Sequence, residues 1–356
     1  MTRESTTRLQ VSAHRFQARR MERALRCGQP AGGPAPGGSA LAFGCLLSAV
    51  ALAGAVALAV LRPQPGLGDA PILLDRASGA LYVRVGDTVH PVFNLASARL
   101  IAGTAADPRP VDGAAIGRAR RGPPLGIPGA PGVLGRALDD TATWSICDDA
   151  AVGTTLIAGV DLAASRRIDP REAVAVRSES GIDYLLRSGR RAPAGQPPPA
   201  PRRVSALLLN AVPEAVLVDA VPVALPVELP AAATTLCAHW RAGDPDGITL
   251  SAGVGLPLPD GAAPTILAQA DGPGPALDAV YLPPGRSAYV RGGTGPGYLI
   301  ADTGVRFTVA VAAAARSLGL PETPVTVPWP MLAGLPAGPL LGAEQAGATR
   351  DVGPGR

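Results

Sequence analysis

The residues with the clearest chemical potential in this chain are two cysteines and a nearby histidine. Cys147 and Cys237 lie about ninety residues apart, and His239 follows the second cysteine by two positions. Thiolates and imidazoles bind zinc, but this spacing matches none of the common zinc-ligand patterns. In an oxidising compartment the two thiols form a disulfide, and closing such a loop adds about 4 kcal/mol of stability in the chain-entropy model. We therefore favour a Cys147–Cys237 disulfide over a metal site.

A glycine-rich loop suggests nucleotide chemistry. Residues 292–297 read GGTGPG, a backbone that a phosphate can approach closely. A P-loop also needs a lysine within Gly-x-x-x-x-Gly-Lys-Ser/Thr, and this chain contains no lysine at any position. No helix start obviously follows the loop. We interpret it as the connection of a β-hairpin, and we predict no nucleotide cofactor.

A second group of residues suggests hydrolytic chemistry. The triplet at 302–304, Asp-Thr-Gly, matches that of aspartic proteases, which need two aspartates that share a proton. The equivalent triplet of a related segment, 187–189, reads Arg-Ser-Gly and has no carboxylate. No Gly-x-Ser-x-Gly nucleophile elbow occurs, and His14, His90 and His239 are scattered along the chain. We predict no catalytic residue, and a turn at Asp302.

An uncharged apolar run determines where these residues should lie. Residues 41–61 contain no charge, and as a helix they would be about 31 Å long, against a hydrocarbon core of roughly 30 Å. Seven arginines and two glutamates precede the run, whereas Arg62 alone follows it closely. Because positive charge stays in the cytoplasm, we expect a cytoplasmic arm over 1–40, a transmembrane helix over 41–61 and an exoplasmic remainder. The rival interpretation is a cleaved signal peptide, whose apolar region is ~7–15 residues long behind a short basic segment.

The charge balance excludes a nucleic-acid-binding surface on the exported part. The chain has a formal net charge of +4, and the arm contributes +5 from its seven arginines and two glutamates. The remainder is therefore close to neutral, at −1. The basic arm suits anionic lipid headgroups or a cytoplasmic partner. Since aromatic residues make up only 3% of the chain, the core must consist mainly of Val, Leu, Ile and Ala.

The exported part is predicted to be β-rich and repetitive. Residues 72–95 alternate between apolar and polar around two turn sequences, which predicts three short strands. Two segments starting at Gly153 and Gly247 share the pattern Gly-x-Thr-Leu-x-Ala-Gly-Val-x-Leu, and a cysteine precedes each. We therefore expect a mainly β (α+β) protein. A single N-terminal transmembrane helix should be followed by an exoplasmic domain of β-rich repeats, which a disulfide links to each other. The expected parts are a first module over 69–190, a proline-rich linker over 191–230, a second module over 231–330 and a tail over 331–356.

Several segments, in order along the chain, resemble one known family. They are VSAHRFQARRMERAL, ILLDRASGALYVRVGDTVHPVFNLASARLIAG, PLGIPGAP, TWSICD, LLNAVPEA, TTLCAHW, YLIADTGVRFTV, LGLPETPVTVPWPML and LPAGPLL. With these segments the chain resembles EccB, a membrane component of the type VII (ESX) secretion systems of mycobacteria and other actinobacteria. Family members usually carry a further pair of repeats between LLNAVPEA and TTLCAHW, so the chain is similar to a shortened relative.

The resemblance implies a function in protein secretion. It implies a single-pass inner-membrane protein that builds the periplasmic part of the machine with an EccC-like ATPase and EccD-like and EccE-like membrane subunits. Because arginines beside an aromatic ring suit a protein partner as well as lipid, we expect contacts through the arm. The residues expected there are His14, Arg15, Phe16, Arg19 and Arg20. Two alternatives stay open: ATP hydrolysis, since the family often carries an ATPase label, and binding to the cell wall.

Overall fold

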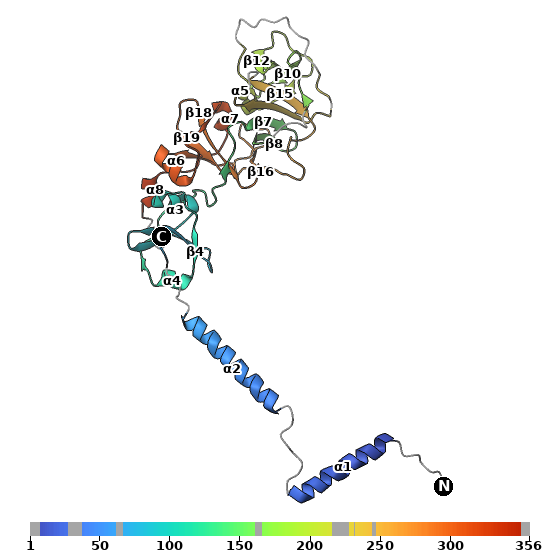
Figure 1. The fold of residues 1–356 in the computed structure, drawn as a ribbon. Coiled ribbons are helices and arrows are strands. Elements are labelled where there is room, and N and C mark those ends of the chain that lie inside the picture. The colour runs from blue at the N-terminus through green and yellow to red at the C-terminus, as the bar shows by residue number, and fades with distance from the viewer. Residues whose placement is uncertain are drawn as a thin grey trace, which may run out of the picture. The chain divides into compact units, whose positions relative to one another are not determined.

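The computed structural model describes residues 8–27, 38–61, 67–160, 166–215, 228–230, 232–243 and 247–349. The chain divides into two compact units, Met1–Gln64 and Pro65–Arg356, which Figure 1 draws as two lone helices and a β-rich body. The first unit contains α1 (Arg8–Cys27) and α2 (Gly38–Leu61). Strong helix formers, chiefly Arg, Ala and Leu, account for α1, and Gly28 and Pro30 follow it in the sequence.

Helix α2 corrects the prediction of a membrane span. In the part of the chain that the structure describes, no helix combines the length and the apolar character needed to cross a membrane. The predicted single transmembrane helix over 41–61 is therefore wrong, whereas the mainly β, α+β character of the rest is confirmed.

The second unit contains three copies of one folding motif. Each copy has three antiparallel strands in a meander, a fourth strand that pairs parallel to the first, and a short helix after that strand. In the first and third copies another helix precedes the fourth strand. The three sheets have the orders β4-β1-β2-β3-β5, β12-β11-β10-β13 and β20-β19-β18-β21. The shared topology identifies an internal repeat that includes the N-terminal strands.

The elements of the copies are short. The first copy consists of β1 (Ile72–Asp75), β2 (Leu81–Val85), β3 (Thr88–Val92), α3 (Leu95–Ala102), β4 (Arg109–Val111), α4 (Gly113–Gly117) and β5 (Arg120–Arg121). The second consists of β10 (Ala173–Arg177), β11 (Asp183–Arg187), β12 (Arg190–Pro193), β13 (Arg202–Arg203) and α5 (Ala206–Ala211). The third consists of β18 (Arg286–Gly292), β19 (Gly297–Ile300), β20 (Arg306–Val309), α6 (Ala312–Leu318), β21 (Val325–Val327) and α7 (Trp329–Ala333). The three strands predicted within 72–95 are thus confirmed.

Capping residues set where the helices of the copies begin. Asn94 accepts a hydrogen bond from the Ser97 backbone N–H at 2.9 Å and so starts α3. Asp112 and Ser205 cap α4 and α5 in the same way. These side chains satisfy backbone donors that the first helical turn leaves without partners. Gly103 ends α3 in the left-handed conformation, with a φ of 67°.

A seven-stranded sheet is built from strands that precede and strands that follow the second copy in the sequence, and it packs against the second and third copies. Its strand order is β16-β17-β8-β7-β14-β15-β9. The strands are β7 (Thr143–Asp149), β8 (Gly153–Ala158), β9 (Arg166–Arg167), β14 (Thr235–Arg241), β15 (Ile248–Gly253), β16 (Thr265–Ile266) and β17 (Ala279–Tyr281). The two segments with the shared glycine pattern form β8 and β15, which flank the central pair β7 and β14. The two cysteine-bearing segments therefore belong to one sheet.

Two large apolar clusters hold the copies together. One cluster covers a face of the seven-stranded sheet and includes Trp144, Ile146 and Leu236, packed against the second and third copies. The other joins the first and third copies through Leu100 and Phe307. There α3 packs beside α6 and α8 (Ala343–Gly347), as Figure 1 shows. Each such buried side chain contributes roughly 1.5–3 kcal/mol. A further short strand, β6 (Arg136–Ala137), pairs with β18.

Candidate functional site

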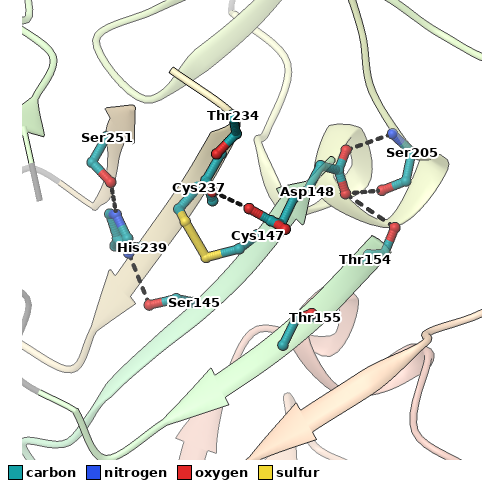
Figure 2. Close-up of a disulfide and its surroundings, with 12 residues drawn as sticks. Ser145, Cys147, Asp148, Thr154, Thr155, Ser205, Thr234, Cys237, His239 and Ser251 are labelled. Atoms are coloured by element: carbon teal, nitrogen blue, oxygen red, sulfur yellow. Dashed lines mark hydrogen bonds between the residues drawn. A yellow bond between two sulfur atoms is a disulfide. The ribbon is translucent and has the colours of Figure 1, made fainter. Parts of the chain in front are cut away.

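The predicted disulfide is present at the centre of the seven-stranded sheet. Cys147 of β7 and Cys237 of β14 are directly paired across the antiparallel ladder and are bonded through their sulfurs (Figure 2). Both residues are buried, and Ile157 and Tyr281 pack beside them. The disulfide thus links two neighbouring strands of one sheet and closes a loop that contains the whole second copy.

A buried histidine lies on the same face of the sheet as the disulfide. One ring nitrogen of His239, Nδ1, is 2.8 Å from Ser145 Oγ, and the other, Nε2, is 2.6 Å from Ser251 Oγ (Figure 2). Burial, and to a smaller extent the positive charge of Arg167, lower the pKa of His239 to about 4. Because both nitrogens are engaged by hydroxyl groups inside the protein, this side chain is a structural element.

The histidine should make the stability of the second unit depend on pH. The folded-state pKa of about 4 lies below the unfolded value of about 6.5, so the unfolded state binds more protons between these values. The free energy of unfolding should have its full value above pH 6.5 and should fall by about 3 kcal/mol as the pH drops towards 4. Urea unfolding at several pH values should show this loss, and His239→Gln should flatten it. An unchanged pH dependence in the variant would contradict the assignment.

A carboxylate connects the central sheet to the second copy. Asp148 accepts hydrogen bonds from the backbone N–H of Ser205 at 2.6 Å and from its hydroxyl at 2.7 Å (Figure 2). Thr154 of β8 donates a third bond at 3.0 Å. The pKa of Asp148 is raised above its ordinary value, chiefly by burial, and these hydrogen bonds and the charge of Arg202 only partly oppose the rise. Since Ser205 is also the cap of α5, Asp148 fixes the start of that helix against β7 and β8.

The buried acids Asp149 and Asp278 are also used for structure. Asp278 accepts backbone N–H groups of Thr154 at 2.7 Å and of Gly272 at 2.7 Å. Asp149 accepts from Ala151 N–H at 2.9 Å and from the Thr235 hydroxyl. Among the residues that the structure describes, no three His, Cys, Asp or Glu side chains gather in an arrangement suited to a metal ion.

The sequence motifs that suggested catalysis occupy turns. The glycine-rich residues 292–297 join β18 to β19, where Gly295 N–H bonds the carbonyl of Gly292 at 3.1 Å. Asp302 is exposed in the turn between β19 and β20. The related triplet at 187–189 forms the turn between β11 and β12.

A tyrosine–arginine pair recurs in the three copies, which the sequence analysis missed. An arginine guanidinium lies over the ring of the tyrosine in the second strand of each copy. The pairs are Tyr82 with Arg121, Tyr184 with Arg191, and Tyr298 with Arg306. In the third copy Trp329 adds a second ring 4.7 Å from the same guanidinium. The tyrosine at the second position of β2, β11 and β19 is the sequence feature that identifies this contact in all three copies.

The five predicted partner-binding residues lie exposed on α1 but do not share one side of it. Residues four apart are neighbours on a helix, which places Arg15 beside Arg19 and Phe16 beside Arg20. At about 100° per residue these two pairs lie on different sides, and His14 lies on a third. Phe16 is 68% exposed.

Known proteins resemble this chain over most of its length. The family model "Type VII secretion system ESX-1, transport TM domain B" matches residues 3–224 and 216–354. The "ESX-3 secretion system ATPase EccB3" of Mycolicibacterium smegmatis is 30% identical over 436 residues, which cover 88% of this chain and 84% of that protein. The "ESX-5 secretion system ATPase EccB5" of Mycobacterium marinum is 38% identical over 201 residues, 52% of this chain and 40% of that protein.

Solved structures show the same fold. A chain of an intact ESX-5 inner membrane complex superposes with a TM-score of 0.68 at 26% identity, covering 100% of this chain and 98% of that one. A chain of the EccB3 dimer from the ESX-3 core complex gives a TM-score of 0.65 at 26% identity, covering 79% of this chain and 100% of that one.

Proposed function

Since this chain belongs to the EccB family of type VII secretion systems, we propose that its second unit is a periplasmic building block of the secretion complex. As a member of that family the protein is a structural subunit of the type VII secretion machinery. The observation that carries the periplasmic placement is the buried Cys147–Cys237 disulfide, because structural disulfides persist in oxidising compartments and are rare in the cytosol. The related ESX-5 structure titled as a periplasmic assembly supports the same location.

The architecture of the second unit suits assembly better than catalysis. The second and third copies pack on a cross-linked sheet, and the first copy packs on the third. The buried His239 and Asp278 and the half-buried Asp148 are engaged in hydrogen bonds inside that framework. Relatives carry the word ATPase in their names. This chain has no lysine for a P-loop, and its glycine-rich loop is a hairpin turn. We therefore assign it no nucleotide-hydrolysing role.

We propose that the protein works in a multimeric complex with an EccC-like ATPase and EccD-like and EccE-like membrane subunits. Related chains come from an inner membrane complex and from a dimer, which supports a multimeric state. Of the five arm residues, Phe16 and Arg20 form the pair that combines a large exposed ring with a guanidinium. Such a pair is typical of the energetic centres of protein interfaces. We propose this side of α1 as the partner contact.

Purification in mild detergent from the native host tests the partner proposal. The wild-type protein should co-purify with the EccC-like and EccD-like subunits. Phe16→Ser should release them and stop substrate export, since the exposed ring supplies the apolar contact. For co-purification in detergent, where no bilayer is present, Met21→Ser is the matched control, because Met21 is 73% exposed on the same helix but lies on a different side. Equal recovery of partners with the wild type and Phe16→Ser would refute the assigned contact.

A further inference from the structure

Four arginines form a single stripe along α1. Arg8, Arg15, Arg19 and Arg26 follow one another at intervals of 7, 4 and 7 residues. At about 100° per residue these intervals keep all four within roughly 40° around the helix axis. The acidic residue of this helix is Glu22, which pairs with Arg26 at 3.0 Å. The stripe is therefore strongly positive over the whole length of α1.

An apolar stripe runs beside the arginines. Val11, Ala18 and Leu25 recur every seven residues, and Met21 lies close to the same line. This line is about a quarter turn from the arginine stripe. Met21 and Leu25 are 73% and 85% exposed. A helix with an apolar line flanked by arginines has the pattern of an interfacial membrane helix.

Charge decides which occupant fits these stripes. The six arginines and one glutamate of α1 give it a net charge of +5. Two such helices would repel each other, and the apolar line covers only about two heptads, too few for a coiled coil with a second copy. Arginine guanidinium groups bind phosphate through forked donors, and an anionic bilayer offers phosphates beside an apolar layer. An anionic lipid surface therefore satisfies both stripes at once.

We propose that α1 lies along an anionic phospholipid surface. The line of Val11, Ala18, Met21 and Leu25 enters the headgroup boundary, and the arginine stripe binds lipid phosphates. Phe16 lies nine residues before Leu25, which places it on the opposite side of the helix. It is therefore available to a protein subunit. This inference rests on the proposed function, which places the arm in an inner membrane complex.

Vesicle binding tests the orientation of the helix with two charge-matched variants. The purified full chain is mixed with vesicles of phosphatidylcholine alone, or of phosphatidylcholine and phosphatidylglycerol in equal parts, and bound protein is separated by flotation. The wild type should prefer the phosphatidylglycerol vesicles, and added salt should weaken the preference. The double variant R15Q/R19Q should reduce that preference roughly 30-fold, since each arginine at an anionic surface contributes about fivefold.

The double variant R20Q/R23Q is the control, because it removes the same charge from outside the stripe. It should reduce the preference about threefold or less. Equal losses in the two variants would overturn the assigned orientation, and equal wild-type binding to both vesicles would overturn lipid binding itself. If R15Q/R19Q instead releases co-purifying subunits without changing vesicle binding, the stripe binds protein and the inference is wrong. Co-purification of the wild type with its partners is measured separately, so failure here leaves the subunit proposal intact.

Discussion

Replacing Cys147 with serine should lower the free energy of unfolding of the second unit by about 4 kcal/mol. The disulfide closes a loop with a sequence separation of 90, and a cross-link over that length restricts the unfolded chain by about this amount in the loop-entropy model. The loop contains the entire second copy. Without the cross-link, all of that chain gains freedom on unfolding.

The measurement is thermal or urea unfolding of purified wild type and Cys147→Ser. A loss of this size corresponds to a melting temperature lower by roughly 6 °C for a unit of this length, at about 2.1 cal/mol/K of unfolding entropy per residue. The reduced wild type should behave like the variant. The matched control is Cys45→Ser, which removes the free, exposed cysteine of α2 and should leave the melting temperature unchanged. An unchanged melting temperature for Cys147→Ser would show that the cross-link does not hold the sheet together.

The disulfide could be predicted from the sequence because the prediction needs only the number of cysteines beyond residue 61 and the oxidising compartment expected for them. The sequence also predicts β1, β2 and β3, since their alternation and turn residues lie within about twenty residues of one another. The pairing of β7 with β14 joins segments about ninety residues apart, and no local pattern encodes such a contact. For that reason the union of the two cysteine-bearing segments in one sheet could not be predicted.

Side-chain chemistry on the sheet was only partly visible in the sequence. Ser145 and His239 each lie two positions from a cysteine along β7 and β14, which places them on the disulfide face. The hydrogen bonds of His239 to two serines also require β15, whose register follows from the sheet. Similarly, an apolar run over 41–61 correctly suggests a helix, yet it does not establish a membrane span.

Gly189 should be one of the positions of the second unit that tolerate substitution least. Gly189 lies between β11 and β12 with a φ of 66°, in the left-handed region that favours glycine. A Cβ added there would overlap the backbone carbonyl of Ile248 in β15. Backbone of the central sheet cannot move aside as a flexible side chain would. This turn therefore presses the second copy directly against the seven-stranded sheet.

Gly189→Ala should consequently cost about 4 kcal/mol, from left-handed strain together with the displacement of β15. Gly181→Ala is a closely matched control, because Gly181 occupies the neighbouring turn of the same copy with a φ of 83° and nothing lies within 4 Å of its added Cβ. It should cost about 1 kcal/mol, the strain alone. Urea unfolding of the two variants separates the cost of backbone strain from the cost of the overlap with β15. Both variants have the left-handed conformation, but only the alanine at position 189 would contact the sheet. Equal losses would mean that the second copy does not pack on β15 through this turn. A difference of about 3 kcal/mol would measure the energetic cost of disrupting the contact between the second copy and the cross-linked sheet.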